Sequence, residues 1–232
     1  METILPDYQE FIKLEDKTLK LIHHHLSQYR RLAHISGLVQ KSWSCNRRDM
    51  FQFLMYWDVV YMDKDCRLIV GADIAKEKGG SRIANSSHLV CVIEGTNNPI
   101  KILRKFHFDY VTRRSDQRQP HPRFHLQYCG SLSPIAHLNI SNELINRLDP
   151  DVDGPRIFFR PMTLGLLMNM VFHEFPCDDT EKIRIDSAWQ NLVRENEREI
   201  LIPFYNKCIQ LAGRSNFVFF DEAYVWPDKF TN

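Results

Sequence analysis

The side chains best suited to chemistry lie in one stretch of the chain, residues 100–130. Two histidines and a carboxylate supply enough ligands for a divalent metal ion. Two histidines can also cleave a phosphodiester together, one as the general base and the other as the general acid. The pattern alone does not choose between these reactions. The candidate catalytic residues are His107, Asp109, His121, His125 and Gln127.

Two predicted strands position these residues. Because side chains alternate across a strand, His107 and Asp109 share one face of a strand over 106–110. His125 and Gln127 share a face of the next predicted strand in the same way. A hairpin would join the two pairs into one polar patch. Its rim consists of His121 and Arg123, and the core-facing residues are Phe106, Phe108, Tyr110, Phe124, Leu126 and Tyr128.

This polar face has two interpretations. An antiparallel sheet with one face on the core and one in water produces such alternation without any site, and this is the commoner cause. The other interpretation is a catalytic or metal-binding patch, which requires the side chains to converge around a pocket. Burial of His107 and His125, with hydrogen bonds to the backbone, would count against both a catalytic and a binding role.

A group of basic residues accompanies the cluster. Arginine binds phosphate through paired hydrogen bonds, so these residues predict contact with phosphate groups or nucleic acid. Nucleic acid is also held by bases that stack on aromatic rings. The nearby aromatic residues fall on the core-facing side of the predicted strands, so they are not available for stacking. The basic residues are Arg104, Lys105, Arg113, Arg114, Arg118 and Arg123.

The sequence lacks the common catalytic motifs. It contains no phosphate-binding glycine loop, no dinucleotide fingerprint, no G-x-S-x-G elbow and no H-E-x-x-H zinc helix. Arginine–histidine spacings typical of helical ribonucleases begin at Arg114 and Arg118, but Pro120 and Pro122 exclude a helix there. The six cysteines are scattered without a C-x-x-C pair, which indicates free thiols in a reducing cytosol. The pattern names no cofactor.

Composition and charge are those of an ordinary soluble domain. The chain is 44% hydrophobic and 25% charged, and its net charge of +1 gives no global argument for nucleic acid or a membrane as partner. It has no apolar run long enough to span a bilayer and no secretory signal. The sequence therefore predicts a cytoplasmic protein without a membrane partner.

The chain is expected to form a single domain, 1–232. The expected fold is α+β, with an antiparallel sheet of four to five strands packed against helices and a long N-terminal helix. That helix begins at Asp7, a capping residue, and ends near Gly37. The expected parts are a helical segment 1–64, a sheet 65–130 with strands over 67–74, 88–94, 100–110 and 123–129, a helical segment 139–213, and a terminal strand or tail 216–232.

Three further regions of the chain are predicted to be helical. Residues 46–63 are predicted as a helix, with two strands as the alternative because aromatic residues and valine favour sheets. A nearly all-apolar run after Pro161 predicts a buried central helix that ends at Pro176. A further helix over 180–200 is expected to be kinked or broken by Pro203.

Three runs of the sequence, HFDY, PHPRFHLQYCG and PRIFFRPMTLGLLMNMVFHEF, resemble prokaryotic domain families that have no assigned function. Such domains are often components of mobile or defence-associated operons. The resemblance therefore implies a bacterial, defence-associated setting.

The expected function is a non-catalytic subunit of a bacterial multi-protein complex, with a role in anti-phage defence implied by the resemblance. Such a subunit binds a protein partner and, through its basic residues, nucleic acid. The missing catalytic motifs, the neutral charge and two long amphipathic helices motivate this expectation. The alternative is a metal- or histidine-dependent phosphodiesterase or nuclease that uses His107, Asp109, His121 and His125.

Overall fold

The structure is a computed structural model that describes residues 4–27, 50–94, 101–112, 121–128, 156–213 and 224–225. Several predictions fall on other residues. The expected helix end at Gly37 and the segment 139–155 lie outside the described residues, as does most of the tail 216–232. The same holds for Arg113, Arg114 and Arg118.

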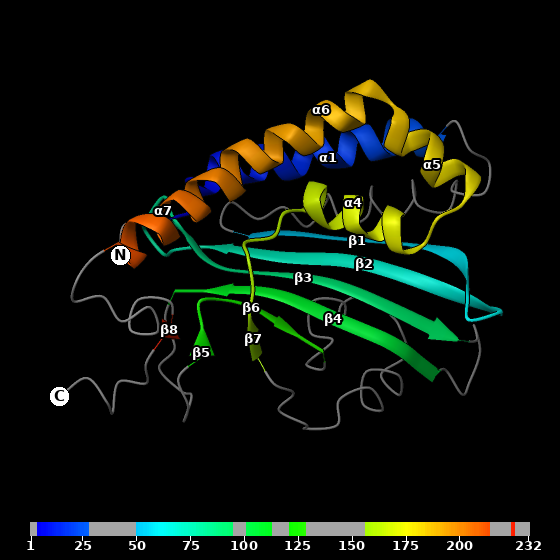
Figure 1. The fold of residues 1–232 in the computed structure, drawn as a ribbon, viewed down its shortest axis with the longest axis horizontal. Coiled ribbons are helices and arrows are strands. Elements are labelled where there is room, and N and C mark those ends of the chain that lie inside the picture. The colour runs from blue at the N-terminus through cyan, green and yellow to red at the C-terminus, as the bar shows by residue number, and fades with distance from the viewer. Residues whose placement is uncertain are drawn as a thin grey trace.

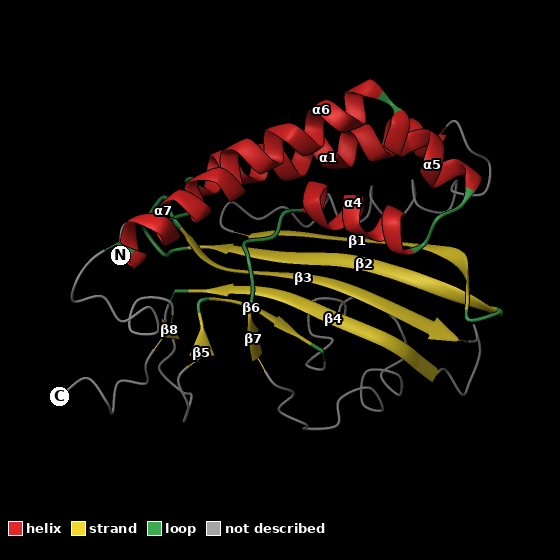
Figure 2. Ribbon diagram, viewed as in Figure 1, coloured by secondary structure: helices red, strands yellow, loops and turns green. Residues whose placement is uncertain are grey.

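A six-stranded antiparallel sheet forms one layer, and helices cover one of its faces (Figures 1 and 2). The strand order is β1-β2-β3-β4-β6-β7, so neighbours in the sheet are near neighbours along the chain. A second sheet pairs β5 (His121–Pro122) with β8 (Tyr224–Val225). The α+β class is confirmed, with six strands in the main sheet rather than four to five. The main strands are β1 (Met50–Tyr61), β2 (Lys64–Lys76), β3 (Ile83–Glu94), β4 (Lys101–Val111), β6 (Phe124–Gln127) and β7 (Arg156–Phe158).

The prediction of a helix over 46–63 was wrong for its described part, which is strand β1. β1 pairs with β2 along its whole length, from Met50 opposite Ala75 to Tyr61 opposite Lys64. Large aromatic and β-branched side chains pack well on a pleated surface, and here that preference decides the structure. The turn between the strands is formed by Met62 and Asp63, whose φ angles are 51° and 58°. Glycine or asparagine usually occupies such positions, so the sequence carried no recognisable turn signal.

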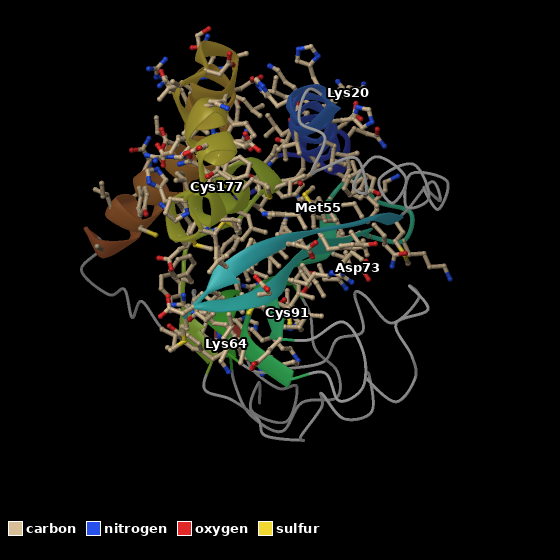
Figure 3. The ribbon with its side chains drawn as sticks, turned by 90° about the vertical axis from the view of Figure 1, so that its right-hand side faces the viewer. Lys20, Met55, Lys64, Asp73, Cys91 and Cys177 are labelled. Carbon is tan, nitrogen blue, oxygen red and sulfur yellow. The ribbon has the colours of Figure 1, made fainter. Side chains whose placement is uncertain are left out.

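The two faces of the sheet carry different side chains. The helix-covered face belongs to the main core, which includes Phe53, Leu68, Val90 and Phe108. The opposite face carries a smaller apolar cluster of Leu54, Ile69, Leu89, Cys91 and Ile93. Figure 3 shows Met55 on the helix side of the sheet, with Asp73 and Cys91 on the other side.

The helix layer begins with α1 (Tyr8–Ser27), which Asp7 caps as predicted: the Glu10 N–H donates to Asp7 Oδ1 at 2.9 Å. The predicted central helix is α4 (Leu164–Glu174), and most of its residues are buried. It lies between the sheet and the outer helices (Figure 1). An ion pair between Lys17 and Glu195 joins α1 to the outer helix α6 (Ser187–Asn196).

The helix expected over 180–200 is two helices. α5 (Asp178–Ile185) ends at Asp186, whose carboxylate caps α6 by accepting the N–H groups of residues 188 and 189. Pro203 does not break the chain of helices, because α6 continues through a π turn, η3 (Glu197–Leu201), into α7 (Ile202–Ala212). Proline cannot donate the hydrogen bond of an α-helix, and the wider π turn stands directly before it.

A buried carboxylate ties α1 to α4 and to the sheet. Both oxygens of Glu15 lie 3.1 Å from the backbone nitrogen of Leu164, in the first turn of α4. Glu15 Oε1 also lies 3.5 Å from His88 Nε2 of β3, and both side chains have no exposed surface. The unpaired N–H groups of a helix N-terminus stabilise a negative charge, which makes this burial tolerable.

Thr163 connects the start of α4 to α6. Its hydroxyl accepts the Leu166 N–H at 3.3 Å and donates to Asn196 Oδ1 at 2.7 Å. Asn196 in turn donates through Nδ2 to the Leu192 carbonyl at 2.8 Å. A Cβ atom at Gly165 would lie 2.7 to 3.0 Å from the atoms of the Asn196 amide. Gly165 therefore leaves the space that Asn196 occupies.

We expect Gly165→Ala to destabilise the protein. Overpacking costs roughly 1–3 kcal/mol, which exceeds the gain of about 1 kcal/mol from replacing glycine by alanine in a helix. Chemical denaturation measures the free energy of unfolding. Gly213→Ala is the control, because its nearest neighbours would lie at 3.7 Å or more. In an Asn196→Ala background the cost of Gly165→Ala should disappear; an unchanged cost there would contradict the packing argument.

Candidate functional site

The strand register brings together four of the five predicted catalytic residues. His107 lies opposite Gln127 and Asp109 lies opposite His125, as the alternation predicted. All four belong to the face of the sheet that the helices do not cover. His121 lies in the separate strand β5, where it pairs with Val225.

The Asp109–His125 pair is the centre of this arrangement. His125 Nε2 lies 3.3 Å from Asp109 Oδ2, and its Nδ1 lies 2.9 Å from the Pro122 carbonyl oxygen. Because a carbonyl oxygen only accepts, Nδ1 carries a proton in this contact. Both ring nitrogens are thus engaged with protein groups.

The environment of Asp109 favours its charged form. Burial by itself raises the pKa of a carboxyl group, since it removes water from the charge. Here the hydrogen bonds from His125 and Ser87, together with electrostatic attraction from His107 and His125, outweigh burial and hold the pKa of Asp109 below its ordinary value. Asp109 is therefore a carboxylate acceptor at neutral pH and does not serve as an acid.

The expectation of a solvated polar face was wrong at these strands. The exposed fractions are 4% for His107, 2% for His125 and 8% for Gln127. The alternation of polar and apolar residues indicates which side chains share a face of the sheet, but it does not indicate what covers that face. The aromatic residues expected in the core do face the helix layer, and Phe108, Tyr110 and Phe124 are buried there, whereas Tyr128 is exposed.

The structure adds residues that sequence analysis missed. Asp109 and His125 belong to a polar row that crosses five strands in register. Gln52 Nε2 donates to Asp73 Oδ2 at 3.1 Å within this row. Finding the row requires the registers of β1, β2 and β3, which depend on the unrecognised turn at residues 62–63. The polar row consists of Gln52, Asp73, Ser87, Asp109 and His125.

The order of groups in the polar row limits its chemistry. A nucleophilic serine needs an imidazole within reach of its hydroxyl, with the carboxylate behind the ring. Ser87 instead hydrogen-bonds to the carboxylate of Asp109, so the row is not a nucleophilic triad. In the apolar cluster on the same face of β3, burial raises the pKa of Cys91 to about 12, which keeps that thiol protonated. Within the described part of the chain, no group of three or more His, Cys, Asp or Glu side chains could hold a metal ion.

The described basic residues do not share one surface. Arg104 lies on the helix side, 3.1 Å from Glu174 and over the ring of Phe106. Lys105 is buried on the opposite face, in register with Cys91. Arg123 donates to the carbonyl oxygen of Thr112 at 3.2 Å.

We expect Asp109 to make the free energy of unfolding depend on pH in the acidic range. Because its pKa is lowered by folding, its contribution is complete above the unfolded-state value, near 3.8, and is lost as the pH falls through the folded-state value. Asp109→Asn should therefore reduce the free energy of unfolding at pH 7, and the difference from wild type should shrink below about pH 4.

Denaturant unfolding between pH 7 and pH 2.5 measures this difference. Asp58→Asn is the matched control, because the Asp58 side chain is largely exposed and its contact with Arg67 is long, at 3.4 Å. A difference for Asp109→Asn that stays constant over the whole pH range would contradict the assignment of Asp109 as a stabilised carboxylate.

Comparison with known proteins identifies no relative of this chain. No protein-family model matches it, and neither the curated proteins nor the solved structures contain a significant match. Among the described helices, none is both long and apolar enough to cross a membrane. The function must therefore be argued from the geometry of the chain itself.

Proposed function

We propose that this protein is a non-catalytic subunit that binds a protein partner through helix α7. The observation that carries the proposal is a stripe of exposed large apolar side chains on this helix. Ile202, Tyr205 and Ile209 follow one another at spacings of three and four residues, which places them on one side of a helix. We call these three residues the α7 stripe.

Packing among the described residues accounts for only part of the α7 stripe, since the Tyr205 ring contacts the buried Phe204 ring at 5.3 Å between centroids. The buried side of the same helix is occupied by Phe204, whose ring contacts Phe124 and Phe158. Ile209 is 70% exposed and contributes little to that core. Single exposed apolar residues are common, but an aligned set on one helix is typical of a contact surface.

The rest of the proposal, namely the cellular setting and nucleic acid as an additional partner, rests on the sequence. A bacterial, defence-associated complex follows from the resemblance of the sequence runs alone, the cytoplasm follows from the scattered cysteines and the lack of a secretory signal, and both remain part of the proposal. Nucleic acid as an additional partner rests on the basic residues. Of these, Arg104 and Arg123 are partly accessible and already contact protein groups.

The alternative function is a phosphodiesterase or nuclease. The observation in its favour is that His107, Asp109, His125 and Gln127 lie on adjacent strands of one face. General acid–base catalysis also requires access to the substrate. The burial of both histidine rings and the engagement of both nitrogens of His125 count against this alternative, and equally against a binding role for the polar face, so the proposed binding function rests on the α7 stripe.

We expect a photo-crosslinking amino acid in the α7 stripe to capture one discrete polypeptide in cells. Tyr205 replaced by p-benzoylphenylalanine keeps an aromatic ring at the position. The exposed residue Gln190 of α6 provides the control position. Adding Ile209→Glu should abolish the adduct at position 205 while changing the free energy of unfolding by less than about 0.5 kcal/mol. Loss of stability instead would show that the stripe belongs to the core.

We expect no phosphodiester cleavage that depends on the polar row. The assay incubates the purified chain with single- and double-stranded DNA and RNA, with and without Mg²⁺, Mn²⁺ or Zn²⁺. His125→Asn is the informative variant, because an amide keeps hydrogen-bonding capacity without acid–base function. Cleavage by the wild type that disappears in a folded His125→Asn protein would establish the alternative and refute the non-catalytic proposal.

A further inference from the structure

Two arginines that are distant in sequence lie together at the end of the main sheet where β2 and β4 end (Figure 1). Hydrogen bonds between neighbouring segments place them there. The Ala84 carbonyl, two residues beyond Arg82, accepts both the N–H and the hydroxyl of Thr112, at 3.2 and 2.9 Å. The Thr112 carbonyl in turn accepts a hydrogen bond from the Arg123 guanidinium at 3.2 Å. Arg82 and Arg123 therefore occupy the same corner of the sheet.

Tyr110 places its hydroxyl at this corner. Its ring stacks on that of Phe124, the residue after Arg123, with 4.7 Å between the centroids, and the residue is only 7% exposed. Burial raises the pKa of the Tyr110 hydroxyl, and the nearby positive charges of Arg123 and Arg82 lower it. The Glu77 carboxylate also acts on this group and raises its pKa. The hydroxyl is therefore protonated at neutral pH and can donate a hydrogen bond.

Donors at this corner are unused within the described part of the chain. There the Tyr110 hydroxyl makes no hydrogen bond, and neither the Arg82 guanidinium nor the Lys78 ammonium forms an ion pair. Lys78 and Arg82 are exposed, and the Tyr110 oxygen is not sealed from solvent. The hydroxyl of a side chain as buried as Tyr110 usually has a hydrogen-bond partner. Its position beside two guanidinium groups indicates that the missing partner is an anion.

We propose that this corner binds a phosphate group of a nucleic-acid backbone, with Arg82, Tyr110 and Arg123 as donors to its oxygens. Guanidinium groups and hydroxyls are common donors to phosphate oxygens. Lys78, on the turn that precedes Arg82, adds a further positive charge. We call these four residues the basic corner. The inference deepens the proposed contact with nucleic acid and rests on it, but it is independent of the α7 stripe.

Glu77 favours a phosphodiester over other phosphate groups. Its carboxylate lies over the turn between β2 and β3, where a Cβ atom at Gly80 would lie 3.1 Å from one of its oxygens. A backbone diester carries one negative charge, whereas a phosphorylated side chain carries nearly two. The smaller charge is repelled less by Glu77. The exposure of Lys78 and Arg82 also suits a continuous backbone, which passes over a surface and needs no pocket.

Binding of the full-length protein to fluorescein-labelled oligonucleotides, measured by fluorescence anisotropy at several salt concentrations, tests the proposal. Single-stranded and duplex DNA of 20 nucleotides or base pairs, roughly the span of a few phosphate contacts, serve as probes. Arg82→Gln should weaken binding about tenfold and reduce the salt dependence. Tyr110→Phe should weaken binding by a similar factor, and it keeps the ring stacked on Phe124. Arg198→Gln and Tyr128→Phe are matched controls, because they make the same chemical changes at other exposed positions.

Glu77→Gln provides a variant with the opposite expected effect. Removing this carboxylate should tighten binding by about threefold, because it takes a negative charge away from the basic corner. A gain in affinity does not arise from misfolding, so this variant separates a direct contact from a structural one. Weaker binding by Glu77→Gln, or equal binding by Tyr110→Phe, Arg82→Gln and the control variants, would overturn the basic corner as the binding site.

Competition experiments distinguish the sources of phosphate. Unlabelled DNA should displace the probe at lower concentrations than inorganic phosphate or a phosphoserine peptide does. More effective displacement by the peptide would assign the basic corner to a phosphorylated protein and overturn the proposal. No binding by the wild type would refute nucleic acid as a partner altogether, whereas binding that is insensitive to the corner variants would refute only its location. Crosslinking at the α7 stripe is unaffected by any of these outcomes.

Discussion

The rest of the structure depends on the buried carboxylate of Glu15. A charge without exposed surface is expensive unless donors surround it, and removing a partner from such a site typically costs about 3–5 kcal/mol. The N–H of Leu164 supplies one donor and His88 lies within 3.5 Å. Because α4 separates the sheet from the outer helices, fixing its first residue to α1 and β3 sets the position of the whole helix layer (Figure 1).

The outer helices follow from that position. Thr163 and Asn196 fix α6 against the start of α4. The buried series then continues through Ile200 to Phe204 at four-residue spacing, which would drift around a regular α-helix. The π turn contains the extra residue that keeps this series facing the sheet. With Phe204 held in the core, the α7 stripe is left on the solvent side, so its exposure follows from the packing of the core.

The sequence was a good guide where alternation is strong and a weaker guide elsewhere. The pairing of β4 with β6 was predictable, since polar and aromatic residues alternate on both strands. β1 was not, because its large apolar residues fit a helical face as well and its turn lacks glycine. Glu15 was recognisable only as an interruption of an apolar stripe, since its partners Leu164 and His88 are distant in sequence. Burial of the polar face depends on what covers the sheet, which local patterns do not contain.

The residues first considered for catalysis have a structural use that explains their burial. β6 has only four residues, so few backbone hydrogen bonds define its register against β4. A slip by one residue would move His125 onto the aromatic face and leave the Asp109 carboxylate without its partner. The Asp109–His125 pair thus specifies one register for a short strand. A polar pair that specifies the fold needs no access to solvent, whereas the proposed contact with a partner requires exposed apolar side chains, which α7 carries.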